Sequence, residues 1–369
     1  MKEITDTLHA LGESGNMRVI PAGLPEGVAD FSSNDYLGLG ADVDLRRDFL
    51  AGVTPELFLP CSSASRLLAS RQDAYASLEG LLRQLYGREA LLFNSGYHAN
   101  TGMIAALGGA GTLFLADKLV HASIIDGLVL SRSQFMRFRH NDYAHLERLM
   151  RAHAGSYSRV VIVAESVYSM DGDSADIEAL LRVKALHPGA MLYLDEAHGV
   201  GVVGDAGLGA GRRYGAAVDI VMGTFGKALA SEGAFAVMGN ALRSFMVNRC
   251  RSLIFSTALA PATVSWTEHV LRRAVEMDSA RAHLRDLSAR LSHILGNGTP
   301  SHIQPFVVGD AHRVVELSQR LRREGINVLP IRTPTVPAGT ERLRFSLSAA
   351  MSSEEMLRLE RAFDAIKKG

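Results

Sequence analysis

Short apolar runs alternate with longer amphipathic stretches between residues 78 and 237. A short apolar run fits a strand that is buried on both faces, and strands that alternate with helices form a mostly parallel sheet covered on both sides. Such runs predict seven strands, at 90–93, 112–116, 134–138, 160–164, 191–194, 220–222 and 234–238. We therefore expect one large seven-stranded sheet in the middle of the chain.

Apolar residues at spacings of three and four predict helices over 74–86, 99–107, 143–152 and 177–184. Near Ser244 the alternation of apolar runs and amphipathic stretches ends, and a long helical region is predicted over 261–295. It is followed by a predicted strand at 303–308, a helix at 314–324, a strand at 343–347 and a helix at 354–367. A chain of 369 residues suits about two domains. We expect an N-terminal segment (1–40), a large α/β domain (41–243) and a smaller α+β domain (244–369).

Charge and cysteine content narrow the range of functions. The 39 basic and 39 acidic residues balance, and they form no basic stripe for nucleic acid and no polybasic run for anionic lipid. The two cysteines, Cys61 and Cys250, predict neither a disulfide framework nor a metal centre. The N-terminal residues lack the apolar core of a secretory signal, and no segment is long enough to span a membrane. We expect a cytoplasmic enzyme that acts on small molecules, with no metal, nucleic acid or membrane as partner.

Asp195 follows a predicted strand, at the sheet edge where open α/β proteins bind ligands. It begins the turn Asp-Glu-Ala-His-Gly, so His198 lies close by, and Lys227 follows in the stretch Gly-Thr-Phe-Gly-Lys-Ala-Leu. A carboxylate that keeps a ring nitrogen protonated and an amine that holds an aldehyde are the two requirements of a pyridoxal phosphate site. A strand-end carboxylate can equally cap a helix, and a lone lysine is usually solvated. Their occurrence together favours the cofactor site.

A phosphate site is predicted at Gly96 and Tyr97, between a strand and a helix, where backbone N–H groups and the helix dipole attract an anion. The alternative is an ordinary helix start. Thr224 offers a further hydroxyl to the same anion.

Four further positions are candidates for the same site. His121 follows an apolar run and could stack on a cofactor ring, and Ser169 follows another strand end. Arg332 and Arg344 flank a proline-rich loop and could bind a substrate carboxylate bidentately. A structural histidine and exposed arginines are the ordinary alternatives.

As a set, these residues resemble the α-oxoamine synthases, which are pyridoxal-phosphate enzymes with the aspartate-aminotransferase fold. The resemblance runs from about Phe31 to the C-terminus and is carried by 32–38, 95–100, 121–124, 169–173, 195–199, 226–228 and 331–349. It implies a type I fold, with a large domain built on a seven-stranded, mostly parallel sheet and a smaller α+β C-terminal domain.

The resemblance also implies roles for individual residues. The implied catalytic residues are Lys227, His121, Asp195 and His198. The implied cofactor contacts are Gly96, Tyr97, His121, Ser169, Asp195, His198, Thr224 and Lys227, together with Ser256 and Thr257 from a neighbouring subunit of a homodimer. The implied substrate contacts are Arg18, Asn34, Arg332, Thr335 and Arg344.

Within the family, three segments most resemble the branch that condenses L-alanine with a pimeloyl thioester. They are 331–337, 343–348 and 139–142. The implied products are 8-amino-7-oxononanoate, a biotin precursor, with carbon dioxide and the free thiol carrier, and the thioester is pimeloyl-CoA or pimeloyl-acyl carrier protein. Activity as a 5-aminolevulinate synthase or a glycine C-acetyltransferase stays an alternative. A catalytically idle scaffold subunit is an alternative of another class, since fold alone does not imply function.

The sequence departs from the family pattern in places. Cys-Ser-Ser-Ala-Ser at 61–65 stands where relatives have a glycine-rich segment, and Tyr75 stands where histidine is frequent. Ser-Glu-Gly at 231–233 replaces a glycine-rich run. These departures concern the acyl substrate more than the cofactor.

Overall fold

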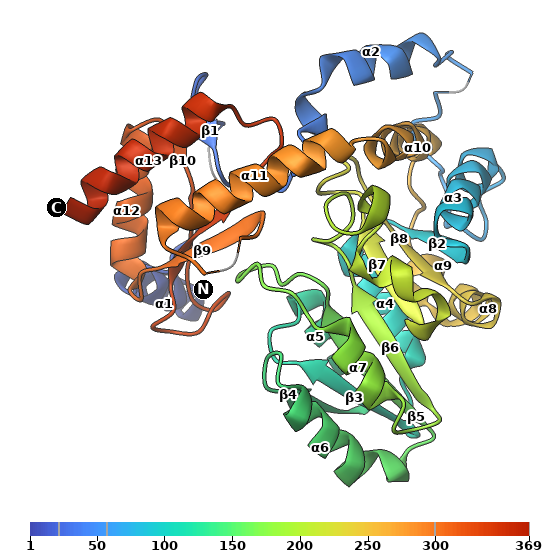
Figure 1. Ribbon diagram of the computed structural model, residues 1–369. Coiled ribbons are helices and arrows are strands. Elements are labelled where there is room, and N and C mark those ends of the chain that lie inside the picture. Colours follow the sequence, from blue (N-terminus) through green and yellow to red (C-terminus); the bar gives the residue numbers. More distant parts are fainter. Residues whose placement is uncertain (21–22, 57, 299, 369) are drawn as a thin grey trace. The chain divides into compact units, whose positions relative to one another are not determined.

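The computed structural model describes residues 1–20, 23–56, 58–298 and 300–368. The chain divides into two compact units (Figure 1). The large unit contains Leu39–Tyr168 and Ser174–Asp278. The small unit contains Met1–Gly38, Ser169–Asp173 and the residues from Ser279 onward. In the described part of the chain, no helix combines the length and the apolar character needed to cross a membrane.

One seven-stranded sheet forms the centre of the large unit. Its spatial order is β2 (Glu89–Phe93), β8 (Ala234–Met238), β7 (Ile220–Thr224), β6 (Ala190–Asp195), β5 (Arg159–Glu165), β3 (Thr112–Asp117) and β4 (Gln134–Phe138). β8 is antiparallel to both of its neighbours, and the other pairs are parallel. The prediction of one seven-stranded, mostly parallel sheet is therefore confirmed.

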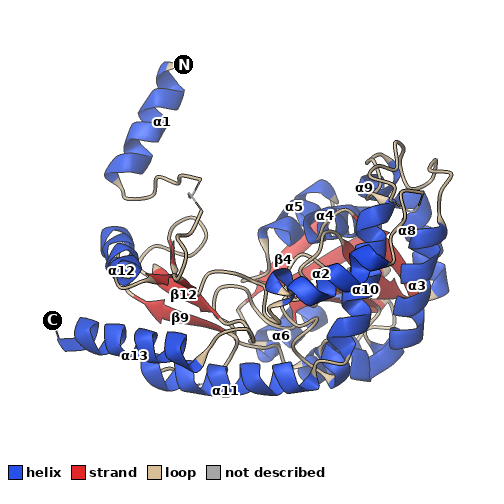
Figure 2. Cartoon of the chain, turned by 90° about the horizontal axis from the view of Figure 1, so that it is seen from above, coloured by secondary structure: helices blue, strands red, loops and turns tan. Residues whose placement is uncertain are grey.

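Helices cover both faces of this sheet (Figure 2), which explains why its strands, apart from the edge strand β4, are apolar over most of their length. The helices are α2 (Val43–Ala51), α3 (Asp73–Tyr86), α4 (Gly96–Leu107), α5 (Ala122–Leu130), α6 (Tyr143–His153), α7 (Ile177–Lys184), α8 (Asn240–Arg249), α9 (Arg251–Ile254) and α10 (Pro261–Val275). Met103 and Ile104 of α4, Leu128 of α5 and Met246 of α8 join the strand residues in one buried cluster. The sheet is thus held in place by packed apolar side chains.

The small unit has a three-stranded antiparallel sheet of its own. Its order is β11 (Leu329–Ile331), β12 (Arg342–Ser346), β9 (Ile303–Val307), and a separate parallel pair joins β1 (Ala29–Asp30) to β10 (Ile326–Asn327). Its helices are α1 (Lys2–Glu13), α11 (Asp278–Leu295), α12 (Ala311–Arg323) and α13 (Ser353–Lys368). The ring of Phe345 lies edge-on to those of Phe31 and Phe363, at 6.1 and 5.6 Å between centroids. Residues from both ends of the chain therefore share one core.

The observed units differ from the predicted boundaries of 1–40, 41–243 and 244–369. The predicted helical region 261–295 is two helices, α10 and α11, and α10 packs against α3, so residues 244–278 lie in the large unit. The N-terminal segment belongs to the small unit, because β1 pairs with β10. These assignments depend on contacts between distant residues, which local pattern does not report.

The segment Ser169–Asp173 also belongs to the small unit, although its neighbours in sequence belong to the large one. Arg342 of β12 binds Asp171 at 2.5 Å. Gly172 has a φ of +70°, and a Cβ at this position would lie 1.8 Å from the carbonyl oxygen of Ile303. Only glycine allows this approach, so the turn is closely fitted to β9.

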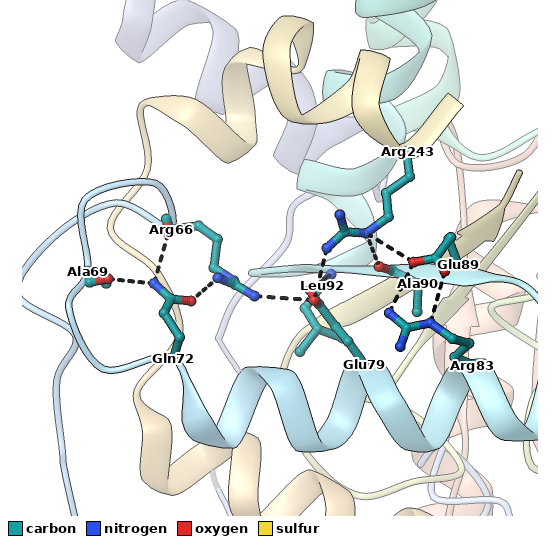
Figure 3. A network of polar contacts seen from close by, with 9 residues as sticks. All are labelled: Arg66, Ala69, Gln72, Glu79, Arg83, Glu89, Ala90, Leu92 and Arg243. Carbon is teal, nitrogen blue, oxygen red and sulfur yellow. Dashed lines mark hydrogen bonds and ion pairs between the residues drawn. The ribbon is translucent and has the colours of Figure 1, made fainter. Parts of the chain in front are cut away.

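A buried carboxylate fixes the edge of the large unit's sheet. Figure 3 shows Glu79 of α3 between the guanidinium groups of Arg66 and Arg243, each 3.2 Å away. Glu79 also accepts the backbone N–H of Leu92 in β2, at 3.3 Å. One side chain thereby joins α3, β2, α8 and the loop before α3.

The Glu79→Ala variant should lower the free energy of unfolding by about 3 kcal/mol, because two partly buried guanidinium groups lose their counter-charge. The control is Asp44→Ala, since Asp44 and Arg47 form an ion pair whose side chains are 85% and 74% exposed. The control should change stability by no more than about 0.5 kcal/mol. Calorimetric melting of the three proteins measures this difference, and equal effects of the two substitutions would contradict the assigned role of Glu79.

Candidate active site

A cavity of about 170 Å³ lies in the large unit, at the carboxyl ends of β5, β6 and β7. Open α/β sheets bind their ligands at this edge. The cavity is lined by Gly96, Tyr97, Asn100, His121, Ser123, Glu165, Asp195, Ala197, His198, Met222, Thr224 and Lys227. The structure thus brings together the predicted catalytic residues and three of the predicted phosphate contacts, Gly96, Tyr97 and Thr224.

Lys227 lies in the turn after β7, and its Nζ is 2.8 Å from Nε2 of His198. His198 is buried in the turn after β6, whereas the lysine is half-buried at the cavity. An amine and an imidazole therefore meet at one point of the cavity.

Asp195 is the last residue of β6, and only 4% of its surface is exposed. Oδ1 accepts the backbone N–H of Ala197 at 2.8 Å, and Oδ2 accepts the side-chain amide of Asn100 at 2.8 Å. Two N–H donors thus orient the carboxylate within the cavity wall.

His121 caps the N-terminus of α5. Its Nδ1 accepts the backbone N–H of Ser123 at 3.2 Å, so the proton of the neutral ring is on Nε2. Desolvation lowers the pKa of His121, and the positive charge of Lys227 acts in the same direction, whereas Asp195 opposes it. The ring is therefore a neutral N–H donor near pH 7.

Glu165 is a residue of this cavity that the sequence analysis missed. It ends β5 directly opposite Asp195 on β6, and one of its oxygens accepts the backbone N–H of His121. Burial raises the pKa of Glu165 well above its ordinary value, and the negative charge of Asp195 adds to the rise. Both effects favour the protonated form of Glu165. The strand-end rule that identified Asp195 applies equally to Glu165.

The first turn of α4 forms the predicted anion site. Ser95 caps this helix by accepting the N–H of His98 at 3.2 Å. A Cβ added at Gly96 would meet Thr224 only at 3.7 Å, so the glycine leaves an open space between the helix and β7. The hydroxyl of Thr224 itself donates to the carbonyl of Gly233 at 3.1 Å. The hydroxyl of Tyr97 donates to Asp126.

Ser256 and Thr257 do not line the cavity of their own chain. They lie in the loop after α9, where Thr257 pairs with Ser65. The hydroxyls of Ser62 and Tyr75 both donate to the carbonyl of Leu259, at 2.6 and 2.9 Å. Ser62 and Tyr75, which belong to two of the three departures from the family pattern, therefore bind the loop that carries Ser256 and Thr257.

The remaining predicted residues lie in the small unit and form two clusters. In the first, Arg344 is buried and donates to the carbonyl of Ser169 at 2.5 Å and to the amide oxygen of Asn34 at 3.2 Å. Arg344 thus connects two other predicted site residues.

The second cluster joins Arg18, Arg332 and Thr335. Arg18 donates to the hydroxyl of Thr335 at 3.0 Å, and Arg332 donates to the carbonyl of Gly15 at 2.5 Å. Burial lowers the pKa of Arg332, and the positive charge of Arg18 adds to this effect. Two neighbouring guanidinium groups repel each other, so a bound carboxylate would stabilise them.

Glu196 follows Asp195 and is completely buried. It accepts the hydroxyl of Ser166 at 2.5 Å and the backbone N–H of Gly211 at 2.6 Å. Burial raises the pKa of Glu196 from its ordinary value of 4.5 to about 7, although these hydrogen bonds oppose the rise. This carboxyl holds together the loops behind the Asp195 turn.

The model of the aminotransferase class I and II family matches residues 26–363. The chain belongs to this family. The resemblance to its α-oxoamine synthases is confirmed, because the 8-amino-7-oxononanoate synthase of Haemophilus ducreyi is 48% identical over 342 residues, which cover 89% of this chain and 88% of that protein.

Two solved structures support the same conclusion for the fold. Serine palmitoyltransferase of Sphingomonas wittichii aligns with a TM-score of 0.89 and 29% identity, over 100% of this chain and 96% of the other. A structure of SPT with a PLP internal aldimine aligns with a TM-score of 0.88 and 27% identity, over 99% of this chain and 97% of the other. The chain has the type I fold of pyridoxal-phosphate enzymes, as expected from its sequence.

The residues present fit pyridoxal phosphate, which is the cofactor of the family. The cavity offers an amine at Lys227, a buried carboxylate at Asp195, an imidazole at His198 and the open first turn of α4 beside Gly96. These groups match an aldehyde, a ring nitrogen, a ring hydroxyl and a phosphate. The donor set is thus complete within the large unit for these four parts of the cofactor.

Glu196 should make stability depend on pH. Because its pKa is higher in the folded protein than in the unfolded chain, its contribution is fully present below pH 4.5 and is lost as the pH rises through about 7. The Glu196→Gln variant has no titratable carboxyl at this position, so its stability does not fall with pH for this reason. From about pH 4.5 to 8, the free energy of unfolding of the natural protein should fall by up to about 3 kcal/mol relative to that of the variant. Melting curves across this pH range test the effect, and parallel pH profiles would exclude it.

Proposed function

We propose that this protein is an 8-amino-7-oxononanoate synthase, which condenses L-alanine with a pimeloyl thioester and releases carbon dioxide and the free thiol carrier. The observation that carries the proposal is the meeting of Lys227, His198, Asp195 and His121 around one cavity, in a chain 48% identical to such a synthase. The chemistry of these side chains explains each part of the reaction.

When bound, pyridoxal phosphate supplies an electron sink for the negative charge that develops at the alanine Cα. Lys227 would hold the aldehyde carbon through Nζ, and Asp195 would keep the ring nitrogen protonated. His198 would donate to the ring hydroxyl. The first turn of α4, with Gly96 and Thr224, would bind the phosphate.

Lys227 also moves a proton. Its Nζ would take the proton from the Cα of the bound alanine. His198 Nε2, 2.8 Å from Nζ, is placed to share a hydrogen bond with the amine during this transfer. The same pair can return a proton to the product carbon.

His121 acts on the thioester. Its Nε2–H is directed by the cap at Nδ1, and the lowered pKa of the ring keeps this donor neutral. Such a donor stabilises the carbonyl oxygen as it becomes negative during attack.

The arginines of the small unit bind carboxylates. Arg344 and Arg332 take the carboxylate of alanine, with Asn34 and Thr335 as neutral partners, and Arg18 contributes to binding of the acyl substrate. Guanidinium groups suit this role because they bind a carboxylate with two parallel hydrogen bonds. Ser169 supports the site through its carbonyl bond to Arg344.

A homodimer belongs to the same proposal. Ser256 and Thr257 do not line the cavity of their own chain, and the bonds of Ser62 and Tyr75 to Leu259 hold the loop that carries them, so we assign them to the phosphate site of a neighbouring subunit. A cytoplasmic location is proposed as well, since both cysteines are free thiols.

Turnover assays with a panel of substrates test the reaction. Alanine with pimeloyl-CoA or pimeloyl-acyl carrier protein should release carbon dioxide and give 8-amino-7-oxononanoate, identified by mass. Glycine with succinyl or acetyl thioesters, and serine with palmitoyl-CoA, should be slower by at least about tenfold, which corresponds to 1.4 kcal/mol of transition-state binding. Higher activity with one of these other pairs would replace the proposal with that reaction.

Substitutions test the roles of Lys227 and Asp195 separately. Lys227→Ala should abolish the visible absorbance of the bound cofactor and all turnover, whereas the surface control Lys118→Ala should retain both. Asp195→Ala should keep part of the cofactor and lose most of the rate, by about 100-fold or more, because the ring nitrogen loses its counter-charge. Near-normal kinetics of either Lys227→Ala or Asp195→Ala would refute the assigned role.

A further inference from the structure

A hydrogen-bonded path connects Asp195 to His121. The side-chain amide of Asn100 donates to Oδ2 of Asp195 at 2.8 Å and to Oγ of Ser123 at 2.9 Å. Oγ of Ser123 is in turn 2.8 Å from Nδ1 of His121. Asn100 therefore stands between a cofactor-binding carboxylate and the imidazole on the other side of the cavity.

The chemistry of the partners fixes the direction of each bond. An ionised carboxylate only accepts, so the amide nitrogen of Asn100 must face Asp195. The amide oxygen then accepts the hydroxyl of Tyr193, at 2.7 Å. Since Ser123 Oγ already accepts from Asn100, its own proton is available for Nδ1 of His121. The single lone pair of Nδ1 is then shared between this hydroxyl and the backbone N–H of Ser123.

The part of the path from Asp195 to Ser123 is shielded from water, whereas His121 at its end is exposed. Exposure is 1% for Asn100, 0% for Ser123 and Tyr193, and 4% for Asp195. Hydrogen bonds are stronger in such surroundings, and an unpaired group there is costly. Burial also raises the pKa of Tyr193 well above its ordinary value, so its hydroxyl stays a donor.

Close packing of α4 and α5 makes the path possible. Asn100 lies on α4 and Ser123 on α5, and a Cβ added at Gly127 of α5 would lie 3.0 Å from the carbonyl oxygen of Asn100. The glycine lets the two helices approach closely enough for the side chains to bond.

We propose that Asn100 is a positioning residue, which holds Asp195 and, through Ser123, His121 as one rigid unit. Its role in the reaction rests on the proposed function. The bond network itself does not depend on which thioester is used. Asn100 touches Asp195 directly and reaches His121 only through Ser123. A substitution at residue 100 can therefore affect the imidazole of His121 only through the hydrogen bonds of Ser123.

The test compares Asn100→Ala, Ser123→Ala and the double variant in the full-length holoenzyme, with Thr101→Ala as the control. Thr101 is the next residue of α4, and its hydroxyl bonds to the carbonyl of Tyr97 in its own helix. The first readout is the Nδ1 signal of His121 in ¹⁵N-histidine NMR spectra, assigned with His121→Gln. The second is kcat and KM for alanine.

Asn100→Ala and Ser123→Ala should both move the Nδ1 signal of His121, and the double variant should move it no further. Both should lower kcat by about 10- to 100-fold and change KM by less than about threefold, because misplaced catalytic groups act on the rate. The loss in the double variant should not exceed the larger single loss, as expected for residues of one network. Thr101→Ala should change neither readout.

An unchanged Nδ1 signal in Asn100→Ala, or kcat losses that multiply in the double variant, would overturn the proposal. If Asn100→Ala does not fold, Tyr193→Phe replaces it, since this change removes only the hydroxyl bound to Asn100. A shifted Nδ1 signal of His121 in Tyr193→Phe supports the path, and an unshifted signal refutes it. The NMR readout needs no turnover. Failure of the proposed reaction would therefore appear as missing product with the path intact.

Discussion

The burial of the Asp195 carboxylate is the constraint on which the site depends. A charge removed from water must be compensated by hydrogen bonds or by opposite charge. Here Ala197 and Asn100 supply N–H donors, and Lys227 lines the same cavity. The parallel register of β5 and β6 sets the position of this carboxylate, because both strands end at the same edge.

This constraint explains the ionisation of the neighbouring groups. Glu165 lies opposite Asp195, and burial together with the negative charge of Asp195 raises its pKa, which favours the neutral form of this carboxyl. His121 is also neutral, so it can donate a hydrogen bond without adding a positive charge beside Lys227. The cavity therefore combines one buried anion, one amine and neutral donors, an arrangement suited to a cationic ring and a substrate whose charge changes during reaction.

Much of this architecture follows from local sequence. Apart from the edge strand β4, the strands are apolar over most of their length because the sheet is covered on both faces, and Asp195 was recognisable from its place after such a strand. Asn100 was not recognisable, since it lies inside a helix and its significance comes from β6 and α5, which fold against it. The allocation of 244–278 to the large unit likewise depends on the packing of α10 against α3. Patterns within a segment predict its structure, but the partners of a buried polar group arise only when distant segments meet.

The most direct test of the account is to locate the cofactor chemically. The sequence contains six lysines. Borohydride reduction of the purified holoenzyme, followed by digestion and peptide mass mapping, should place a phosphopyridoxyl group on the peptide that contains Lys227 and on no other lysine. A modified peptide from another part of the chain, or the absence of any such group in active protein, would contradict it.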